Sequence, residues 1–203
     1  MIAIIDYQAG NLRSVERALK HLGQDCIITR DLDDILCAER VIFPGVGSAG
    51  KAMDTIISYG IDKVIRDVVA MGIPFLGICL GTQIIFDESE EHDTRCLGII
   101  RGKARKFPDM GEKIPHMGWN TLTVCREHPV LRDIDPDARF YFVHSYYPEP
   151  ENKEDVVAVT RYGISFASVI ARDNVAATQF HPEKSGRPGL AVLENFIRWD
   201  GES

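Results

Sequence analysis

Three short apolar runs in the first half of the chain constrain its fold most strongly. They span residues 2–5, 41–43 and 73–78, and their apolar residues follow one another instead of alternating with polar ones. Such runs are typical of parallel strands that are buried on both faces. Helical patterns lie between them, with apolar stripes over residues 12–22 and 61–69. Strands that alternate with helices predict an α/β fold with a central, mostly parallel sheet flanked by helices.

The later part of the chain has a different pattern. Strand-like runs separated by turns predict additional strands, some of them antiparallel, at residues 98–107, 119–124, 140–146, 156–160, 166–171 and 175–180. A last helix is predicted after Pro188, because proline favours the start of a helix. The polar segment 148–155 is interpreted as a surface loop, and no repeat or linker interrupts the chain. Residues 1–203 are therefore predicted to form a single domain.

Composition and charge exclude several classes of protein. The chain has 23 basic and 30 acidic residues and a formal net charge of −7, which disfavours binding to nucleic acid. No apolar stretch approaches the ~20 residues that span a membrane, and the start lacks the basic flank of a signal peptide. Five cysteines without framework spacing indicate thiols in a reducing compartment. We therefore expect a cytoplasmic protein that binds neither membranes nor nucleic acid.

Residues 77–81, Gly-Ile-Cys-Leu-Gly, are the strongest indication of chemistry. A predicted strand leads into this segment and a helical pattern over residues 82–87 follows it, as in the tight turn that presents a nucleophile between strand and helix. The flanking glycines are expected because such a turn leaves little room for a Cβ atom. The helix dipole would favour the thiolate of Cys79. The alternative interpretation is a buried structural cysteine.

A general base is predicted at His181, at the end of the strand-like run 175–180. Pro182 directs the chain into an extended exit, and Glu183 is placed to accept a hydrogen bond from the imidazole and fix its tautomer. The ends of strands are where α/β sheets form their sites. Cys79, His181 and Glu183 are thus predicted to form a compact triad.

Residues 44–47, Pro-Gly-Val-Gly, follow the second predicted strand. Glycines there free the backbone to aim N–H groups at a developing oxyanion, and the N–H of Leu80 would be a second donor. The same stretch matches the Gly-x-Gly-x-x-Gly pattern of dinucleotide sites through Gly45, Gly47 and Gly50. We reject that interpretation, because a proline opens the turn and the next strand ends in cysteine instead of the acid that binds a ribose.

These motifs resemble those of the class I glutamine amidotransferases, which have a flavodoxin-like fold. The resemblance rests first on residues 77–83 and 181–183, and it extends over nearly the whole chain. Segments 115–120, Pro-His-Met-Gly-Trp-Asn, and 181–185, His-Pro-Glu-Lys-Ser, are the most specific. They are similar to the glutaminase subunits of imidazole glycerol phosphate synthases, which serve histidine biosynthesis.

The resemblance implies a role for each matching position. Cys79 would attack the side-chain amide of L-glutamine, His181 would move the proton, and Glu183 would orient His181. The oxyanion hole would be the backbone of Val46, Gly47 and Leu80. Glutamine would be held by Gln83, Glu91, Ser145 and Tyr146. The face that docks on a (β/α)8 cyclase subunit, forming a heterodimer that receives the ammonia, would include Trp119, Asn120, Tyr141 and Lys184. The family implies no metal and no organic cofactor.

Two positions depart from the family pattern. Gln8 stands where glycine is frequent, and Ala49 stands where an aromatic residue is usual. Other functions remain open at this point: a cysteine hydrolase, an amidotransferase for nucleotide or tryptophan synthesis, or a glutaminase of the same type that feeds another ammonia-dependent synthase. A flavodoxin-like binding module would have a broken triad, and a nucleotide-binding oxidoreductase would need the missing acid.

Overall fold

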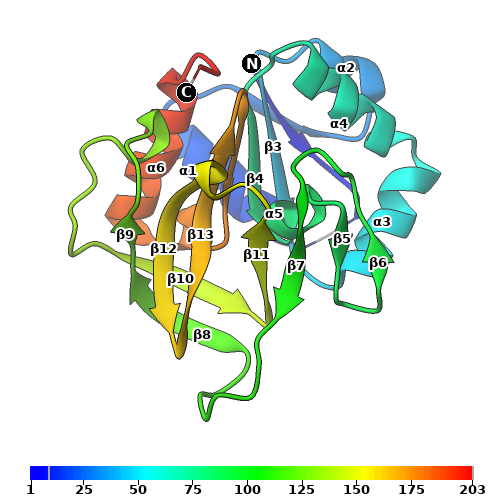
Figure 1. The fold of residues 1–203 in the computed structure, drawn as a ribbon. Coiled ribbons are helices and arrows are strands. Elements are labelled where there is room, and N and C mark those ends of the chain that lie inside the picture. The colour runs from blue at the N-terminus through cyan, green and yellow to red at the C-terminus, as the bar shows by residue number, and fades with distance from the viewer. Residues whose placement is uncertain (9, 203) are drawn as a thin grey trace.

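The structure, a computed structural model, describes residues 1–8 and 10–202. Its centre is an eight-stranded sheet in the order β2-β1-β3-β4-β14-β13-β12-β9 (Figure 1). The first five of these are mutually parallel: β2 (Cys26–Thr29), β1 (Ile2–Ile5), β3 (Arg40–Gly45), β4 (Phe75–Cys79) and β14 (Val175–Thr178). Antiparallel pairing continues the sheet through β13 (Ile164–Arg172), β12 (Val156–Tyr162) and β9 (Thr123–Val124). The predicted fold class, a mostly parallel sheet with added antiparallel strands, is confirmed.

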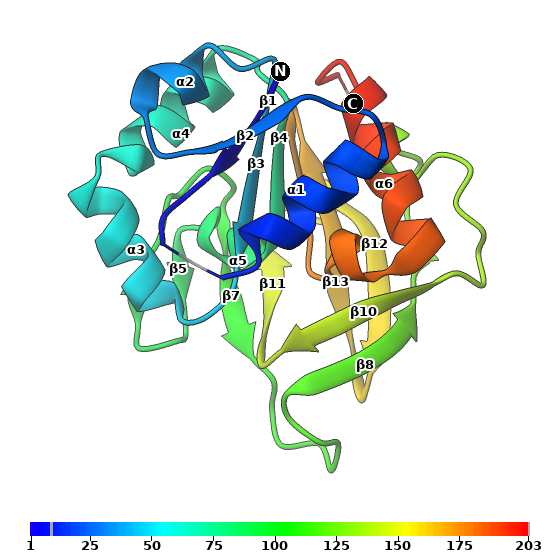
Figure 2. The ribbon, with the colours of Figure 1, turned by 180° about the vertical axis from the view of Figure 1, so that it is seen from behind.

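Helices cover both faces of this sheet (Figure 2). One face packs against α1 (Leu12–His21) and α6 (Gly186–Arg198), and the other against α2 (Leu32–Leu36), α3 (Ala49–Ser58) and α4 (Ile61–Ala70). Strand β1 shows why its run does not alternate in polarity. Ile2 and Ile4 belong to the core on the α1 face, whereas Ala3 and Ile5 belong to the core on the α3 face. Both sides of the strand are buried, so both need apolar residues.

Two smaller sheets complete the structure. The antiparallel pair β8 (His116–Thr121) and β10 (Arg139–His144) crosses the end of the main sheet (Figure 1). The other has the order β11-β7-β5-β6 and contains β11 (Tyr146–Pro150), β7 (Gly102–Lys106), β5 (Glu88–Ser89) and β6 (Thr94–Arg95). A short helix, α5 (Leu80–Ile84), follows β4, and single 3-10 turns lie at η1 (Pro129–Leu131), η2 (Lys153–Asp155) and η3 (Pro182–Lys184).

Several predicted boundaries are wrong, for identifiable reasons. Helix α6 begins at Gly186, before Pro188, because a proline in the first turn removes an N–H that has no partner within the helix. Helix α5 begins at Leu80 and not at Thr82, since the nucleophile turn leads directly into it. The run 119–124 is divided, because β8 pairs with β10 whereas β9 pairs with β12. Within the described residues, no helix has the length and apolar character needed to cross a membrane.

Besides His181, three histidines are buried in this fold. His116 and His144 lie among Phe107, Phe142 and Phe166, with His116 stacked on Phe142 at a centroid distance of 4.8 Å. His128 packs edge-on against the Trp199 ring at 5.1 Å. Burial lowers the pKa of His116 and of His128 to about 4 and that of His144 to about 3. All three are therefore neutral in the folded protein at pH 7.

We expect these histidines to make the fold acid-sensitive between pH 6.5 and 4. Unfolded histidines titrate near pH 6.5, so in this window the unfolded chain binds more protons and stability falls as the pH decreases. Each group contributes a slope of up to about 1.4 kcal/mol per pH unit. Urea unfolding between pH 5 and 7 measures the slope. His128→Phe should reduce it by one histidine's share, whereas the exposed His21→Ala should not; an unchanged slope in His128→Phe would contradict the assignment.

Candidate active site

Cys79 is the last residue of β4, directly before α5, and has a strained backbone conformation. Its φ is 55° and its ψ is −104°, outside the regions that residues with a side chain ordinarily occupy. The flanking glycines make the turn possible. A Cβ atom on Gly81 would lie 2.0 Å from the carbonyl oxygen of Phe43, and one on Gly77 would lie 2.9 Å from the carbonyl oxygen of Gly81. The close approach of α5 to β3 therefore requires glycine at position 81, and the tight turn from β4 into α5 requires glycine at position 77.

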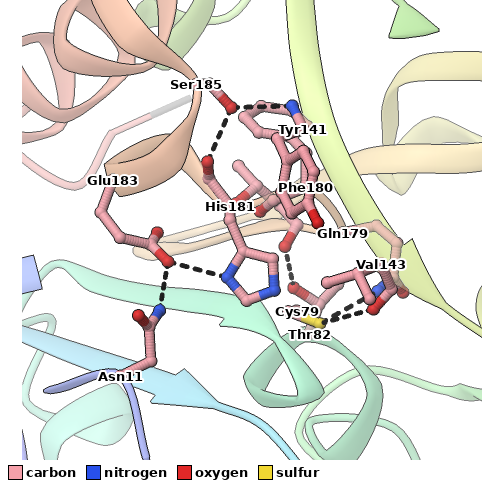
Figure 3. A network of polar contacts seen from close by, with 11 residues as sticks. Asn11, Cys79, Thr82, Tyr141, Val143, Gln179, Phe180, His181, Glu183 and Ser185 are labelled. Atoms are coloured by element: carbon pink, nitrogen blue, oxygen red, sulfur yellow. Dashed lines mark hydrogen bonds and ion pairs between the residues drawn. The ribbon is translucent and has the colours of Figure 1, made fainter. Parts of the chain in front are cut away.

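His181 and Glu183 form a buried pair beside Cys79 (Figure 3). The distance from Nδ1 of His181 to Oε1 of Glu183 is 2.8 Å. Because the carboxylate accepts, Nδ1 carries the proton, and Nε2 is left facing the thiol of Cys79 (Figure 3). The amide of Asn11 also donates to Oε1 of Glu183, an interaction that sequence reasoning missed. Asn11 directly precedes α1, so the start of the first helix helps to hold the Glu183 carboxylate in place.

The backbone around His181 is fixed by a second set of hydrogen bonds. Its N–H donates to the carbonyl of Tyr141 at 2.9 Å, and its carbonyl accepts from the hydroxyl of Ser185 at 2.6 Å (Figure 3). Burial lowers the pKa of His181, but the neighbouring Cys79 and Glu183 side chains raise it more, so the net pKa is raised. This environment favours the imidazolium form of His181.

One pocket of about 340 Å³ collects the predicted site residues. Cys79 and His181 line it, and Glu183 lies behind His181. The other predicted residues that line it are Val46, Gly47, Leu80, Gln83, Glu91, Ser145 and Tyr146. The structure thus brings together side chains from five separate segments of the chain. The pocket has room for a small amino acid and opens to solvent.

The polar side chains of the pocket are partly engaged with the protein itself. Nε2 of Gln83 donates to the carbonyl of Tyr146 at 3.0 Å, so the nitrogen of this amide is engaged by the protein. One carboxylate oxygen of Glu91 accepts from the N–H of Ala49 at 2.6 Å. Ala49, one of the two departures from the family pattern, therefore helps to fix Glu91 through its backbone. The other departure, Gln8, has a φ of 66°, which explains why glycine is frequent there.

A chain of hydrogen bonds holds the Tyr146 carbonyl from behind. Nδ1 of His144 donates to this carbonyl at 2.7 Å, because a carbonyl can only accept. Nε2 of neutral His144 then accepts from Nδ1 of His116 at 3.0 Å, and Nε2 of His116 accepts from the Asn120 amide at 3.3 Å. Sequence reasoning missed both histidines, since nothing in the local pattern distinguishes them from other motif residues.

The four residues predicted to face a partner do not all point outwards. Trp119 is 53% exposed, Lys184 is exposed, and the Trp119 ring meets the Tyr141 ring edge-on at 5.9 Å. Asn120 lies on the opposite side of β8, and its amide donates to the carbonyl of Arg161 at 3.0 Å. The Asn120 side chain therefore links β8 to β12 instead of facing a partner. Across residues 1–8 and 10–202, no three histidine, cysteine or acidic side chains are grouped as metal ligands would be.

Comparisons with known proteins identify the family of this chain. The family described as "Glutamine amidotransferase class-I" matches residues 3–199. The chain is 50% identical over 210 residues to the protein named "Imidazole glycerol phosphate synthase subunit HisH" from Nitratidesulfovibrio vulgaris (strain DSM 19637 / Miyazaki F), with 100% of this chain and 99% of that one covered. It is 48% identical to the protein of the same name from Methanocaldococcus jannaschii, with 97% and 98% covered.

Solved structures show the same fold at lower identity. A protein solved as "Crystal structure of glutamine amidotransferase" superposes with a TM-score of 0.76 at 20% identity, over 97% of this chain and 100% of that one. The PurLQS structure from Thermotoga maritima gives a TM-score of 0.73 at 20% identity, over 97% of each chain. By sequence and by fold, this chain belongs to the class-I glutamine amidotransferase family, and within it to the HisH subunits.

Proposed function

We propose that this chain hydrolyses L-glutamine to glutamate and ammonia, with Cys79 as nucleophile, His181 as proton carrier and Glu183 as the group that orients His181. The observation that carries the proposal is the buried His181–Glu183 pair beside a cysteine on a strained turn, all within one amino-acid-sized pocket. Membership of an enzyme family that acts on glutamine supports it.

The proposed reaction proceeds through a thioester. The Cys79 sulfur attacks the side-chain amide carbon of glutamine, and the protonated His181 gives its proton to the leaving nitrogen as the C–N bond breaks. Ammonia departs. His181 then takes a proton from water, and the hydroxide attacks the thioester carbon. The C–S bond breaks, glutamate leaves with release of a proton, and the Cys79 thiolate beside protonated His181 is restored. Backbone N–H groups of Val46, Gly47 and Leu80 would stabilise the oxyanion of both tetrahedral intermediates.

Two acceptors in the pocket suit the α-ammonium group of glutamine. Gln83 and Glu91 both line the pocket, and each has one polar side-chain atom engaged by the protein. The amide oxygen of Gln83 and the second carboxylate oxygen of Glu91 would therefore accept from the ammonium group. The backbone of Ser145 and Tyr146 would hold the α-carboxylate side. Because Tyr146 is itself fixed through His144, this part of the pocket is preorganised.

The ammonia would pass to a (β/α)8 cyclase subunit that makes imidazole glycerol phosphate and AICAR in histidine biosynthesis. The names of the half-identical relatives support this partner over the cyclase-like alternatives, and a biosynthetic role suits a cytoplasmic heterodimer. The docking face would include Met117 and Trp119, which are exposed on β8, and Lys184, which is exposed and follows Glu183 directly. Docking there would also protect ammonia from release as ammonium.

We expect the free subunit to hydrolyse glutamine slowly and the partner to activate it. Gly47 has a φ of 101°, so the loop 44–47 contains a backbone position open to a peptide flip that moves an oxyanion donor. A missing donor typically lowers turnover by about 10²–10³-fold. Glutamate release should be measured for the free subunit, for the complex, and for the complex with cyclase ligand. Equal rates in all three would mean that the oxyanion hole is always formed.

Two substitutions test the docking face. Trp119→Ala should weaken the complex and reduce activation, because it removes an exposed aromatic side chain from β8. Val124→Ala is a matched control, since Val124 is 54% exposed and lies on β9. Titration of each variant with the cyclase measures the dissociation constant. Equal affinities for both variants would place the interface elsewhere on the surface.

A further inference from the structure

Gln179 has a fully buried side chain that the proposed reaction leaves without a role. It follows β14 and precedes His181 by two residues, and its N–H donates to the carbonyl of Ser168 at 2.9 Å. Its side chain reaches the nucleophile. Nε2 of Gln179 lies 3.7 Å from the sulfur of Cys79, within hydrogen-bond distance for a sulfur acceptor (Figure 3). The residue therefore touches the reacting atom.

The network fixes which end of the Gln179 amide faces the sulfur. The Tyr146 carbonyl can only accept, so Gln83 must present its nitrogen there, at 3.0 Å. The same nitrogen of Gln83 donates its second proton to Oε1 of Gln179 at 3.2 Å. Oε1 of Gln179 is thereby engaged, and the amide nitrogen is the atom left for Cys79. The orientation of the Gln179 amide therefore follows from the Tyr146 carbonyl, which can only accept a hydrogen bond.

The groups around the Cys79 sulfur determine what the Gln179 N–H contributes electrostatically. The carbonyl oxygen of Val143 lies 3.9 Å from Sγ, where it accepts from the thiol but would repel a thiolate. An N–H donor has the opposite preference, because it binds the charged form of sulfur more strongly. Gln179 is buried and held at its far end, so it needs little reorganisation when the charge forms.

We propose that Gln179 is a further catalytic residue, whose amide N–H stabilises the Cys79 thiolate, and that Gln83 holds the amide in that orientation. This inference rests on the proposed function of Cys79. Gln179 carries no transferable proton, so its contribution is separate from that of His181. Its loss should raise the pH at which Cys79 becomes reactive, whereas a residue that only fills space would not affect that titration.

The test compares Gln179→Met with wild type in the full chain. Methionine is unbranched and of similar length but donates no hydrogen bond. The rate of alkylation of Cys79 by iodoacetamide is followed from pH 5 to 9, with mass spectrometry to separate Cys79 from the other thiols. We expect the midpoint of the profile to rise by about one pH unit, with alkylation about tenfold slower below it. The acidic limb of kcat/KM for glutamine should move by the same amount.

Ser168→Ala is the matched control. Ser168 is also fully buried and beside Gln179, and its hydroxyl donates to the carbonyl of Ala158 at 3.3 Å, away from the sulfur. It should lose stability without a change in the Cys79 midpoint. Gln179→Asn covers the case in which methionine prevents folding, because its shorter amide stays polar but cannot reach Cys79.

The outcomes separate this inference from the proposed function. A wild-type midpoint for Cys79 in folded Gln179→Met or Gln179→Asn overturns the role of Gln179 and leaves the nucleophile unaffected. A wild-type Cys79 that is no more reactive near neutral pH than the exposed Cys125 would instead overturn the proposed function. A raised midpoint in the Gln179 variants, absent in Ser168→Ala, supports the assignment.

Discussion

Replacing Cys79 with alanine is expected to abolish glutamine hydrolysis and to leave the fold intact. No thioester can form without the sulfur, and loss of a nucleophile from a triad typically lowers turnover on the order of 10⁶-fold. Alanine removes one sulfur atom at the edge of the pocket and leaves both flanking glycines in place. Glutamate release and the urea midpoint measure the two effects. Substantial hydrolysis by folded Cys79→Ala would rule out the proposed mechanism.

The other cysteines provide the control. Cys125 is exposed and follows β9, and neither it nor the remaining thiols line the pocket that contains Cys79. Cys125→Ser should retain wild-type hydrolysis. The same is expected for single serine substitutions at Cys26, Cys37 and Cys96, with some loss of stability at Cys96 because it is buried. In a complex of Cys79→Ala with the cyclase, ammonia supplied directly should restore formation of the cyclase product.

Replacing Gly81 with alanine is expected to disrupt the fold around the nucleophile. The added methyl would lie 2.0 Å from the Phe43 carbonyl oxygen, which belongs to a central strand and cannot move aside. Helix α5 would have to separate from β3, which we expect to cost at least about 3 kcal/mol. Cys79 would move with the helix, so activity should fall together with stability. Soluble yield, urea unfolding and glutamate release measure the change.

Gly50→Ala is the matched substitution for Gly81→Ala. Gly50 lies within α3, and a Cβ atom there would lie 3.4 Å from the Thr94 hydroxyl, an ordinary contact that needs little adjustment. Alanine is favoured over glycine in a helix by about 1 kcal/mol, so this variant should be as stable as wild type or more stable. If both glycine variants unfold alike, close packing at Gly81 is not the cause.

The parts of the fold that were predictable have strong local patterns. The runs that became β1, β3 and β4 are apolar on both faces, and α1 and α4 have long apolar stripes. Strand β2 was missed because it has four residues and is only partly buried at the edge of the sheet. Helix α2 was missed because it has five residues, too few to show a helical period.

The same distinction applies to the site. Cys79, His181 and Glu183 stand in compact motifs, so their chemistry could be predicted from the order of residues alone. Asn11 touches Glu183 from 172 positions away, and Gln179 touches Cys79 from 100 positions away. No local pattern reports such contacts, because the first depends on how α1 meets η3 and the second on how β14 lies beside β4. Asn120 was assigned to a docking face by motif, whereas the pleat of β8 turns its side chain inwards.

The backbone of Cys79 places stability and activity in opposition at one residue. Holding a residue with a side chain at its φ and ψ costs on the order of 1–3 kcal/mol, a substantial fraction of the margin by which a domain of this size stays folded. Glycine would adopt the same turn with less strain but would carry no sulfur. A lineage that kept this fold for assembly alone would gain stability by losing its nucleophile. Cysteine at position 79 therefore persists only under continued selection for the reaction.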